Sequence, residues 1–330
     1  MSRQTKKYLN LICFLGFGLI LSVILNNLGQ NAALAGSTEV LAQEASIGGV
    51  AQVNLFQAIV LGFVQGATEF IPISSTAHLK AIPVLFGWGD PGVSFIAVIQ
   101  LGSVAAVLSY FWSDLTQITQ GMIKAVGTSD YDSQDFWLAV GIAVGTVPIV
   151  ILGLMLKVFD PAFYENTLRS MPSIAIVSIV MALLLALAES IGNQKRNFKD
   201  LTVRDGILVG LAQALAIMPG VSRSGSTMTA GLFNNLDRAT AARFSFLLGI
   251  PAILLSGLVE LKELISPAEG TSFELLPLIA ALISSAVFSY LAIAWLLEFL
   301  KRRSTWVFVW YRLGFGVFIL AALALGWIEG

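Results

Sequence analysis

Long apolar runs separated by short polar connections dominate this sequence. Six of these runs reach the roughly 20 residues that an α-helix needs to cross a hydrocarbon core of about 30 Å. They cover residues 93–112, 135–156, 172–191, 240–262, 275–299 and 306–327. The pattern predicts an all-α polytopic membrane protein with about six transmembrane helices.

Two further apolar segments are interrupted near their middle. Residues 55–86 contain Pro72 within a polar stretch, and residues 206–233 contain Pro219 next to Gly220. Proline removes a helical hydrogen bond, and non-helical backbone at membrane depth needs protein or water to satisfy it. We therefore predict two re-entrant helical hairpins, each made of a short helix, a polar tip and a second short helix.

The two interrupted segments resemble each other at a shift of 148 positions. The shift places Gly62 on Gly210, Gln65 on Gln213 and Ser74 on Ser222. Similar halves that insert in opposite orientations form an inverted-topology repeat, with a site where the broken helices meet. The sequence thus predicts a single membrane domain over residues 53–330, with repeat halves at about 53–191 and 205–327.

The charges of the connections predict the orientation. Basic residues fill the connections near 195–204 and 301–303, whereas 263–274 contains acidic residues and neither Lys nor Arg. By the positive-inside rule, the first two face the cytoplasm and the third faces the opposite side. The first hairpin then enters from the outside and the second from the inside. The 113–134 connection is expected to be a cytoplasmic loop, with Lys124 as its only base.

The first 52 residues are expected to form a leader and a linker. Three basic residues precede an apolar run at 9–25, and Ala33-Leu34-Ala35 follows it. This order is typical of a secretory signal peptide, although the run is also long enough for an uncleaved extra span. Both alternatives stay open.

Composition agrees with a membrane protein. The chain is 56% hydrophobic and only 12% charged, with a mean hydropathy of +0.83, whereas soluble domains have roughly 25% charged residues. A net charge of −1 gives no indication of nucleic-acid binding, so the expected surroundings are membrane lipid. The single cysteine, Cys13, excludes a disulfide framework or a thiolate metal site.

The tip of the first hairpin concentrates groups capable of chemistry. It contains the only histidine of the chain, His78, one carboxylate, Glu69, and a set of neutral polar side chains: Gln65, Ser74, Ser75 and Thr76. An ionisable residue at membrane depth indicates a functional site, the alternative being a structural polar contact. Ser75 and His78 are close enough in sequence for a hydroxyl to meet an imidazole.

The second tip, PGVSRSGST at residues 219–227, is suited to anions. Its glycines allow close approach of the backbone, and Arg223 offers the planar fork of donors that fits phosphate. Ser222, Ser224 and Thr227 add hydroxyls. A structural pair between Arg223 and Glu69 is the alternative. The two tips together indicate phosphoryl chemistry on a membrane-embedded substrate.

These motifs resemble the undecaprenyl-diphosphate phosphatase (bacitracin-resistance) family. QGATEFIPISSTAHL (65–79) and PGVSRSGST are similar to its two signatures, and FIAVIQLG (95–102) and FSFLLGIPA (244–252) also match, so that the resemblance covers about residues 53–327. The residues that match the family's functional positions are Gln65, Glu69, Ser75, His78, Ser222, Arg223, Ser224 and Thr227. Many relatives have Glu where this chain has Gln65, which leaves Glu69 as the only carboxylate of the first tip.

The resemblance implies an integral-membrane enzyme of the bacterial inner (plasma) membrane. It would remove the terminal phosphate of a C55 polyprenyl diphosphate, recycle the carrier for peptidoglycan synthesis and confer bacitracin resistance. The family works with a divalent cation, here Mg²⁺ or Ca²⁺ with Glu69 as a ligand. A homodimer is among the expected assemblies, and the active site is expected to open to the extracytoplasmic side.

Our mechanistic hypothesis makes Ser75 the nucleophile and His78 the general base. Arg223 and the cation neutralise charge, while the substrate is bound by Gln65, Ser74, Thr76, Ser222, Ser224 and Thr227. In the rival assignment, His78 itself is the nucleophile. Because re-entrant inverted repeats also occur in transporters, a transporter or lipid flippase is the alternative function.

Overall fold

The structure is a computed structural model that describes residues 53–89, 91–159, 164–265 and 274–328. The expected leader and linker, residues 1–52, lie outside these ranges. Within them the regular elements are helices, apart from one isolated bridge between Arg196 and Leu236. The elements are α2 (Leu55–Glu69), α3 (Ser75–Leu85), α4 (Gly92–Tyr110), α5 (Trp112–Thr128), α6 (Gln134–Phe159), η1 (Tyr164–Leu168), α8 (Met171–Ile191), η2 (Phe198–Asp200), α9 (Val203–Ala214), η3 (Leu215–Ile217), α10 (Arg223–Phe233), α11 (Arg238–Ile265), α12 (Leu275–Leu300) and α13 (Trp306–Ala324).

Five of the six predicted spans appear as single helices that are long and apolar enough to cross a membrane. They are α6, α8, α11, α12 and α13. The sixth, predicted at 93–112, corresponds to α4, which passes the same test only together with α5 across a bend of 66°. The prediction of an all-α polytopic membrane protein is confirmed.

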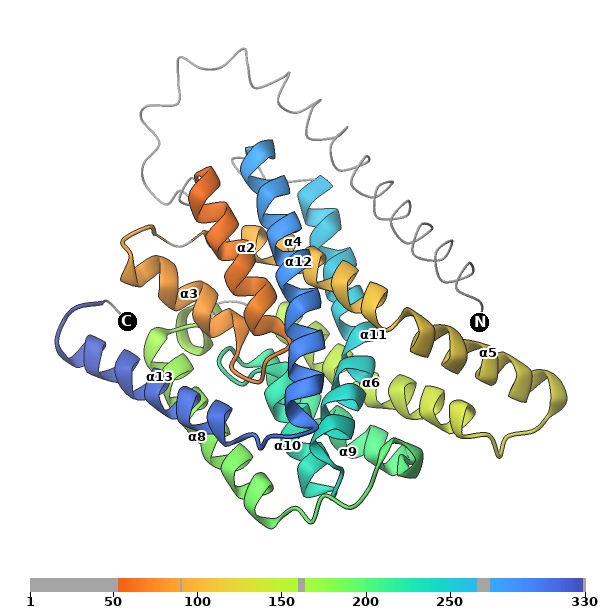
Figure 1. The fold of residues 1–330 in the computed structure, drawn as a ribbon. Helices are drawn as coiled ribbons and strands as arrows, with labels where there is room; N and C mark the ends of the chain where they lie inside the picture. The colour runs from red at the N-terminus through yellow and green to blue at the C-terminus, as the bar shows by residue number, and fades with distance from the viewer. Residues whose placement is uncertain (1–52, 90, 160–163, 266–273, 329–330) are drawn as a thin grey trace.

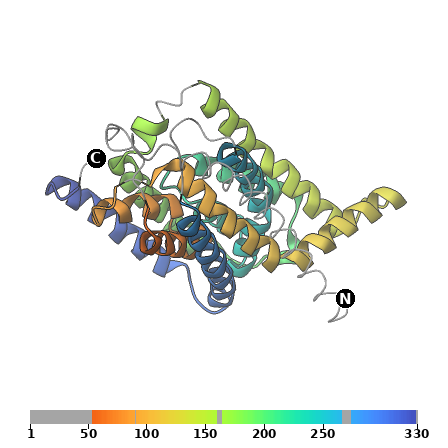
Figure 2. The same cartoon turned by 90° about the horizontal axis from the view of Figure 1, so that it is seen from above.

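The expected loop at 113–134 was wrong, because most of it is the helix α5. Apolar residues recur there at helical spacing, as Leu115, Ile118, Met122 and Ala125. Ile118 and Ala125 are buried. Both views show α5 and the beginning of α6 side by side, extending away from the other helices (Figures 1 and 2).

The two interrupted segments form helical hairpins with matching breaks. Ser74 caps the start of α3 and Ser222 caps the start of α10, and each adopts a positive φ, of 75° and 67° respectively. The first hairpin is α2–α3 and the second is α9–η3–α10, and they begin at opposite ends of the molecule (Figure 1). This arrangement is the one expected for an inverted repeat, and re-entry from each side of a membrane stays a prediction.

Glycines let the first helix of each hairpin pack closely on a long helix. A Cβ on Gly62 of α2 would lie 2.3 Å from the carbonyl oxygen of Ala281 in α12. A Cβ on Gly210 of α9 would lie 2.3 Å from the carbonyl oxygen of Gly145 in α6. Close backbone approach at small residues is the usual basis of helix association in membranes. In both halves, the first helix of the hairpin thus packs against a long helix through the same kind of glycine contact.

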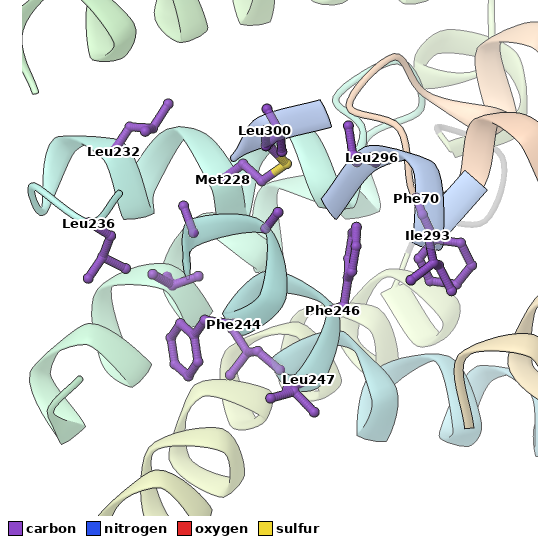
Figure 3. Packing of buried hydrophobic residues seen from close by; sticks show 14 of the residues in the cluster. Phe70, Met228, Leu232, Leu236, Phe244, Phe246, Leu247, Ile293, Leu296 and Leu300 are labelled. Atoms are coloured by element: carbon purple, nitrogen blue, oxygen red, sulfur yellow. The ribbon is translucent and has the colours of Figure 1, made fainter. Parts of the chain in front are cut away.

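One apolar core holds both tips. Phe70, which follows Glu69, is fully buried and meets Phe246 of α11 edge to face at a centroid distance of 5.3 Å. Met228, which follows Thr227 of the second tip, belongs to the same cluster, as do Leu296 and Leu300 of α12 (Figure 3). The residues next to both tips therefore pack in one hydrophobic core.

Candidate active site

The carboxylate of Glu69 lies at the centre of a hydrogen-bonded cluster that joins the two hairpins. Its Oε2 accepts hydrogen bonds from the Ser75 hydroxyl at 2.6 Å and from the Gln65 amide at 3.0 Å. Its Oε1 accepts one from Arg223 of the second tip at 3.1 Å. The side chain of Glu69 is only 9% exposed. The structure thus brings together four of the residues that the sequence predicted.

Local backbone geometry explains why Ser75 returns to Glu69. Gln65 and Glu69 lie four residues apart on α2 and share a face. The chain then turns through Ser74, whose φ of 75° and ψ of 100° are uncommon for a residue other than glycine. Ser75 is the first residue of α3, so its hydroxyl points back to the end of α2. Such a strained turn persists only where the surrounding structure imposes it.

Arg223 occupies the position in the second tip that Ser75 occupies in the first. It begins α10, and its guanidinium packs against Gly249 of α11, where a Cβ would lie 3.2 Å from Cζ. Its described side-chain hydrogen bond is the one from Nη2 to Glu69. A guanidinium has five N–H donors, so Arg223 retains donors for the oxygens of a phosphate.

The predicted hydroxyls have diverse roles. Those of Ser74 and Ser222 cap α3 and α10. That of Ser224 donates to the carbonyl of Ile71 at 3.2 Å and so joins the tips. The hydroxyl of Thr227 is buried between the Arg223 carbonyl and Ser245. Thr76 is exposed, with its hydroxyl 3.1 Å from that of Ser74.

The expected pairing of Ser75 with His78 is not what the structure shows. Nδ1 of His78 lies 2.7 Å from the carbonyl oxygen of Ser74, and Nε2 lies 2.6 Å from the hydroxyl of Tyr311 in α13. Ser75, at the first position of α3, points to Glu69, whereas His78, one turn later, faces α13. The geometry therefore gives Ser75 a carboxylate as its partner in place of the imidazole.

Sequence reasoning missed Arg312 of α13, which binds both tips. The side chain is 1% exposed and donates to the carbonyls of Pro72, Gly220 and Val221 at 3.2, 2.8 and 3.1 Å. These carbonyls lie where the helices are broken and lack helical partners. The signal was available, because an arginine within a predicted span is a functional-site indicator.

A second missed group holds Gln65. The Gln65 amide also donates to the hydroxyl of Ser103 in α4 at 3.3 Å. That hydroxyl is 2.8 Å from Ser289 and 3.2 Å from Ser285, both in α12. All four side chains are buried. Isolated serines in apolar spans carry no sequence pattern that would indicate their assembly.

The residues at the tips offer a divalent cation one strong ligand. Among the described residues, no group of three His, Cys, Asp or Glu side chains is placed to hold a metal. Residue 65 is a glutamine, and its amide nitrogen donates to Glu69. Glu69 is therefore the single carboxylate among the predicted residues of the two tips. Mg²⁺ is commonly bound by one or two carboxylates together with substrate phosphates, so this donor set fits a cation that binds with the substrate.

A family model for the bacitracin resistance protein BacA matches residues 58–318 of this sequence. The match covers both hairpins and most of the helices around them. The chain belongs to the BacA family.

Curated BacA-like relatives named undecaprenyl-diphosphatase are similar over most of their length. The protein from Synechocystis sp. is 64% identical over 83% of this chain and 84% of the relative. Those from Nostoc sp. and a Synechococcus sp. are 61% and 55% identical, over 86% and 88% of this chain and 88% and 98% of the relatives.

Proposed function

We infer that this protein is an integral-membrane phosphatase that hydrolyses undecaprenyl diphosphate to undecaprenyl phosphate and inorganic phosphate. The reaction returns the lipid carrier to peptidoglycan synthesis, and membership of the bacitracin-resistance family links it to resistance to that antibiotic. The inference rests on high identity to curated undecaprenyl-diphosphatases. The structural observation that carries it is the Glu69 carboxylate, which joins a serine hydroxyl to an arginine from the opposite hairpin.

We propose that Ser75 is the nucleophile and Glu69 its base. The Ser75 oxygen forms a bond to the terminal phosphorus while the bond from that phosphorus to the bridging oxygen breaks, and undecaprenyl phosphate leaves. Glu69, 2.6 Å from the hydroxyl, accepts its proton. Water then attacks the phosphoserine, the proton on Glu69 returns to the Ser75 oxygen, and dihydrogen phosphate is released.

Arg223 stabilises the charge on the transferred phosphoryl group in this proposal. Phosphoryl transfer passes through a loose transition state, in which positioning and electrostatics provide most of the catalysis. The hydroxyls of Ser74, Thr76, Ser222 and Ser224 lie around the same turns, where we propose that they contact the diphosphate with Gln65. We propose that Thr227 of α10 supports these groups through its contact with the Arg223 carbonyl.

We propose that a divalent cation, Mg²⁺ or Ca²⁺, binds with the substrate. Glu69 and oxygens of the diphosphate would hold it, and its charge would offset that of the phosphoryl oxygens. Chelation is expected to abolish phosphate release and re-addition of either ion to restore it. Full activity in excess chelator would contradict a cation requirement.

The protein is a multi-pass membrane protein, and we propose that it resides in the bacterial plasma membrane with the tips open to the extracytoplasmic side. The basic connections α8–α9 and α12–α13 lie at one end of the molecule, and α2 and α12 begin at the other (Figure 1). The positive-inside rule assigns the first end to the cytoplasm. A homodimer stays a prediction.

The function is tested with purified protein in detergent and undecaprenyl diphosphate. We expect phosphate release from the wild type and a loss of at least about a hundredfold in Glu69→Gln and Arg223→Ala, because each removes an electrostatic partner of the reaction. Ser109→Ala, which changes a hydroxyl bonded within α4, is the matched control and should retain activity. A wild-type preparation that binds the lipid and releases no phosphate would favour the transporter or flippase alternative.

A further inference from the structure

The single histidine of the chain has both ring nitrogens engaged by neutral groups. A carbonyl oxygen only accepts, so Nδ1 carries the hydrogen and donates to Ser74. In the neutral ring the other nitrogen is then an acceptor, and the Tyr311 hydroxyl donates to Nε2. Since His78 is buried and neither partner is charged, the neutral ring is the favoured form. His78 thus has one defined tautomer, which the Ser74 carbonyl sets and to which the Tyr311 hydroxyl donates at Nε2.

The imidazole shares the acceptor of a backbone hydrogen bond at the start of α3. The backbone N–H of His78 lies 3.4 Å from the Ser74 carbonyl oxygen, whereas Nδ1 of the ring is 2.7 Å away. At the equivalent place in the second tip, the backbone N–H of Ser226 lies 2.9 Å from the carbonyl oxygen of Ser222. The same turn therefore forms in the second half with an ordinary helical bond. In the first tip, the ring is the closer donor to this carbonyl.

The carbonyl that the ring binds sets the position of Ser75. It belongs to the peptide group that joins Ser74 to Ser75, directly after the positive φ of Ser74. A rotation of this peptide would move the Ser75 hydroxyl away from Glu69, to which it is now bonded at 2.6 Å. The orientation of the His78 ring is thus linked, through its hydrogen bond to the Ser74 carbonyl and through the Ser74–Ser75 peptide, to the orientation of Ser75.

Residues of α13 hold the His78 ring in its orientation. Tyr311 and Phe315 stack along the His78 ring, at centroid distances of 5.6 and 4.5 Å. The next residue, Arg312, donates to carbonyls of both tips. Tyr311 therefore lies on a helix that is already anchored to the site.

We propose that Tyr311 is a positioning residue of the phosphatase site. Its hydroxyl donates to Nε2 and holds the His78 ring in place, with the hydrogen on Nδ1 directed at the Ser74 carbonyl, and His78 in turn holds the Ser74–Ser75 peptide in the orientation that places Ser75 against Glu69. The assignment rests on the proposed function, since it gives His78 a positioning role toward Ser75 and leaves the proton transfer to Glu69.

The tautomer can be read directly, because His78 is the only histidine of the chain. With ¹⁵N-labelled histidine and a purification tag free of histidine, NMR should show one protonated nitrogen, Nδ1, and one bare nitrogen, Nε2. Tyr311→Phe keeps the stacked ring and removes the donor, so the Nε2 signal should move. In Tyr290→Phe, an equally exposed tyrosine of α12, it should stay. A hydrogen on Nε2, or an Nε2 signal that ignores Tyr311→Phe, overturns the proposal whatever the substrate of the enzyme is.

Kinetics supply the second readout. Tyr311→Phe is expected to lower kcat roughly three- to tenfold, the size of one lost hydrogen bond, with KM within about twofold, because only alignment changes. His78→Asn keeps an N–H donor near the Ser74 carbonyl and should retain more activity than His78→Ala. Equal and complete loss in both His78 variants would mean that the ring itself performs chemistry, and would overturn the positioning role. An inactive wild type would instead refute the proposed function and leave the NMR result standing.

Discussion

Charged side chains within an apolar environment need partners, and this requirement explains the arrangement of the site. Arg223 meets Glu69 across the two hairpins, and Arg312 meets carbonyls that the broken helices leave without helical donors. A buried charge that lost these partners would be strongly destabilising. The same interactions that allow two interrupted helices to exist also place their tips against each other.

Arg312→Met should therefore strongly destabilise the protein, although Arg312 takes no part in the proposed chemistry. Three carbonyls lose their donor, at a cost of roughly 2–4 kcal/mol in the free energy of unfolding. Arg312→Lys keeps the charge, but one ammonium group does not match three separated oxygens, so we expect it to recover only part of the loss. Thermal unfolding in detergent measures both variants.

The matched control for Arg312 is Arg303→Met, in the exposed connection before α13. It should shift the free energy of unfolding by no more than about 0.5 kcal/mol. Equal stability of the Arg312 and Arg303 variants would contradict the role of Arg312 as the link between the tips.

At this scale the sequence identified most of the proposed site and misassigned one pairing. Glu69, Arg223 and the serines were recognisable because polar residues cluster at two breaks in apolar segments. Ser75 and His78 are near in sequence, and their contact was inferred from that nearness. The partner of His78 comes instead from Tyr311, 233 positions away, a distance over which local spacing carries no information.

At the scale of elements, small residues decide how near the helices come. Gly62 of α2 and Gly210 of α9 face backbone atoms of α12 and α6 at distances that leave no room for a Cβ. Each of these helices ends at a tip, so a displacement of the helix would displace the site. The periodic apolar runs made the long helices predictable, whereas α5 was missed because its polar residues hid a helical apolar face.

Gly210→Ala is expected to lower the midpoint of thermal unfolding and also kcat. The new methyl group would clash with the backbone of Gly145, which cannot move without separating α9 from α6. Gly314→Ala in α13 is the matched control, because a Cβ added there would meet no described atom of another helix within 4 Å. At that position alanine should be neutral or stabilising by up to about 1 kcal/mol. Equal effects of the two substitutions would show that close packing at Gly210 is unimportant.

At the scale of the whole molecule, two similar hairpins begin at opposite ends and meet near the middle (Figure 1). Ser74 and Ser222 adopt nearly the same uncommon backbone conformation, with ψ of 100° and 114°. The two hairpins and their breaks could be inferred from the sequence, because glycine, glutamine and serine recur at a constant shift. Arg312 marked α13 as functionally important, but its contacts with the tips could not be inferred, since α13 has no part in either motif and reaches the tips only in the folded molecule.

The orientation in the membrane can be tested with single cysteines in a Cys13→Ser background. Glu274→Cys should react with a membrane-impermeant thiol reagent in intact spheroplasts, because the acidic connection before α12 is expected outside. Lys195→Cys and Arg303→Cys should react only after the membrane is permeabilised. The reverse pattern would contradict the proposed extracytoplasmic opening of the site.

The most direct test of the proposed site is the identity of the phosphorylated residue. Purified protein is mixed with undecaprenyl diphosphate labelled in its terminal phosphate, quenched within the first turnover and mapped by mass spectrometry. We predict the label on Ser75, with Glu69→Gln slowing its appearance and Ser75→Ala abolishing it. A label on His78, or a fully active Ser75→Ala variant, would contradict the account.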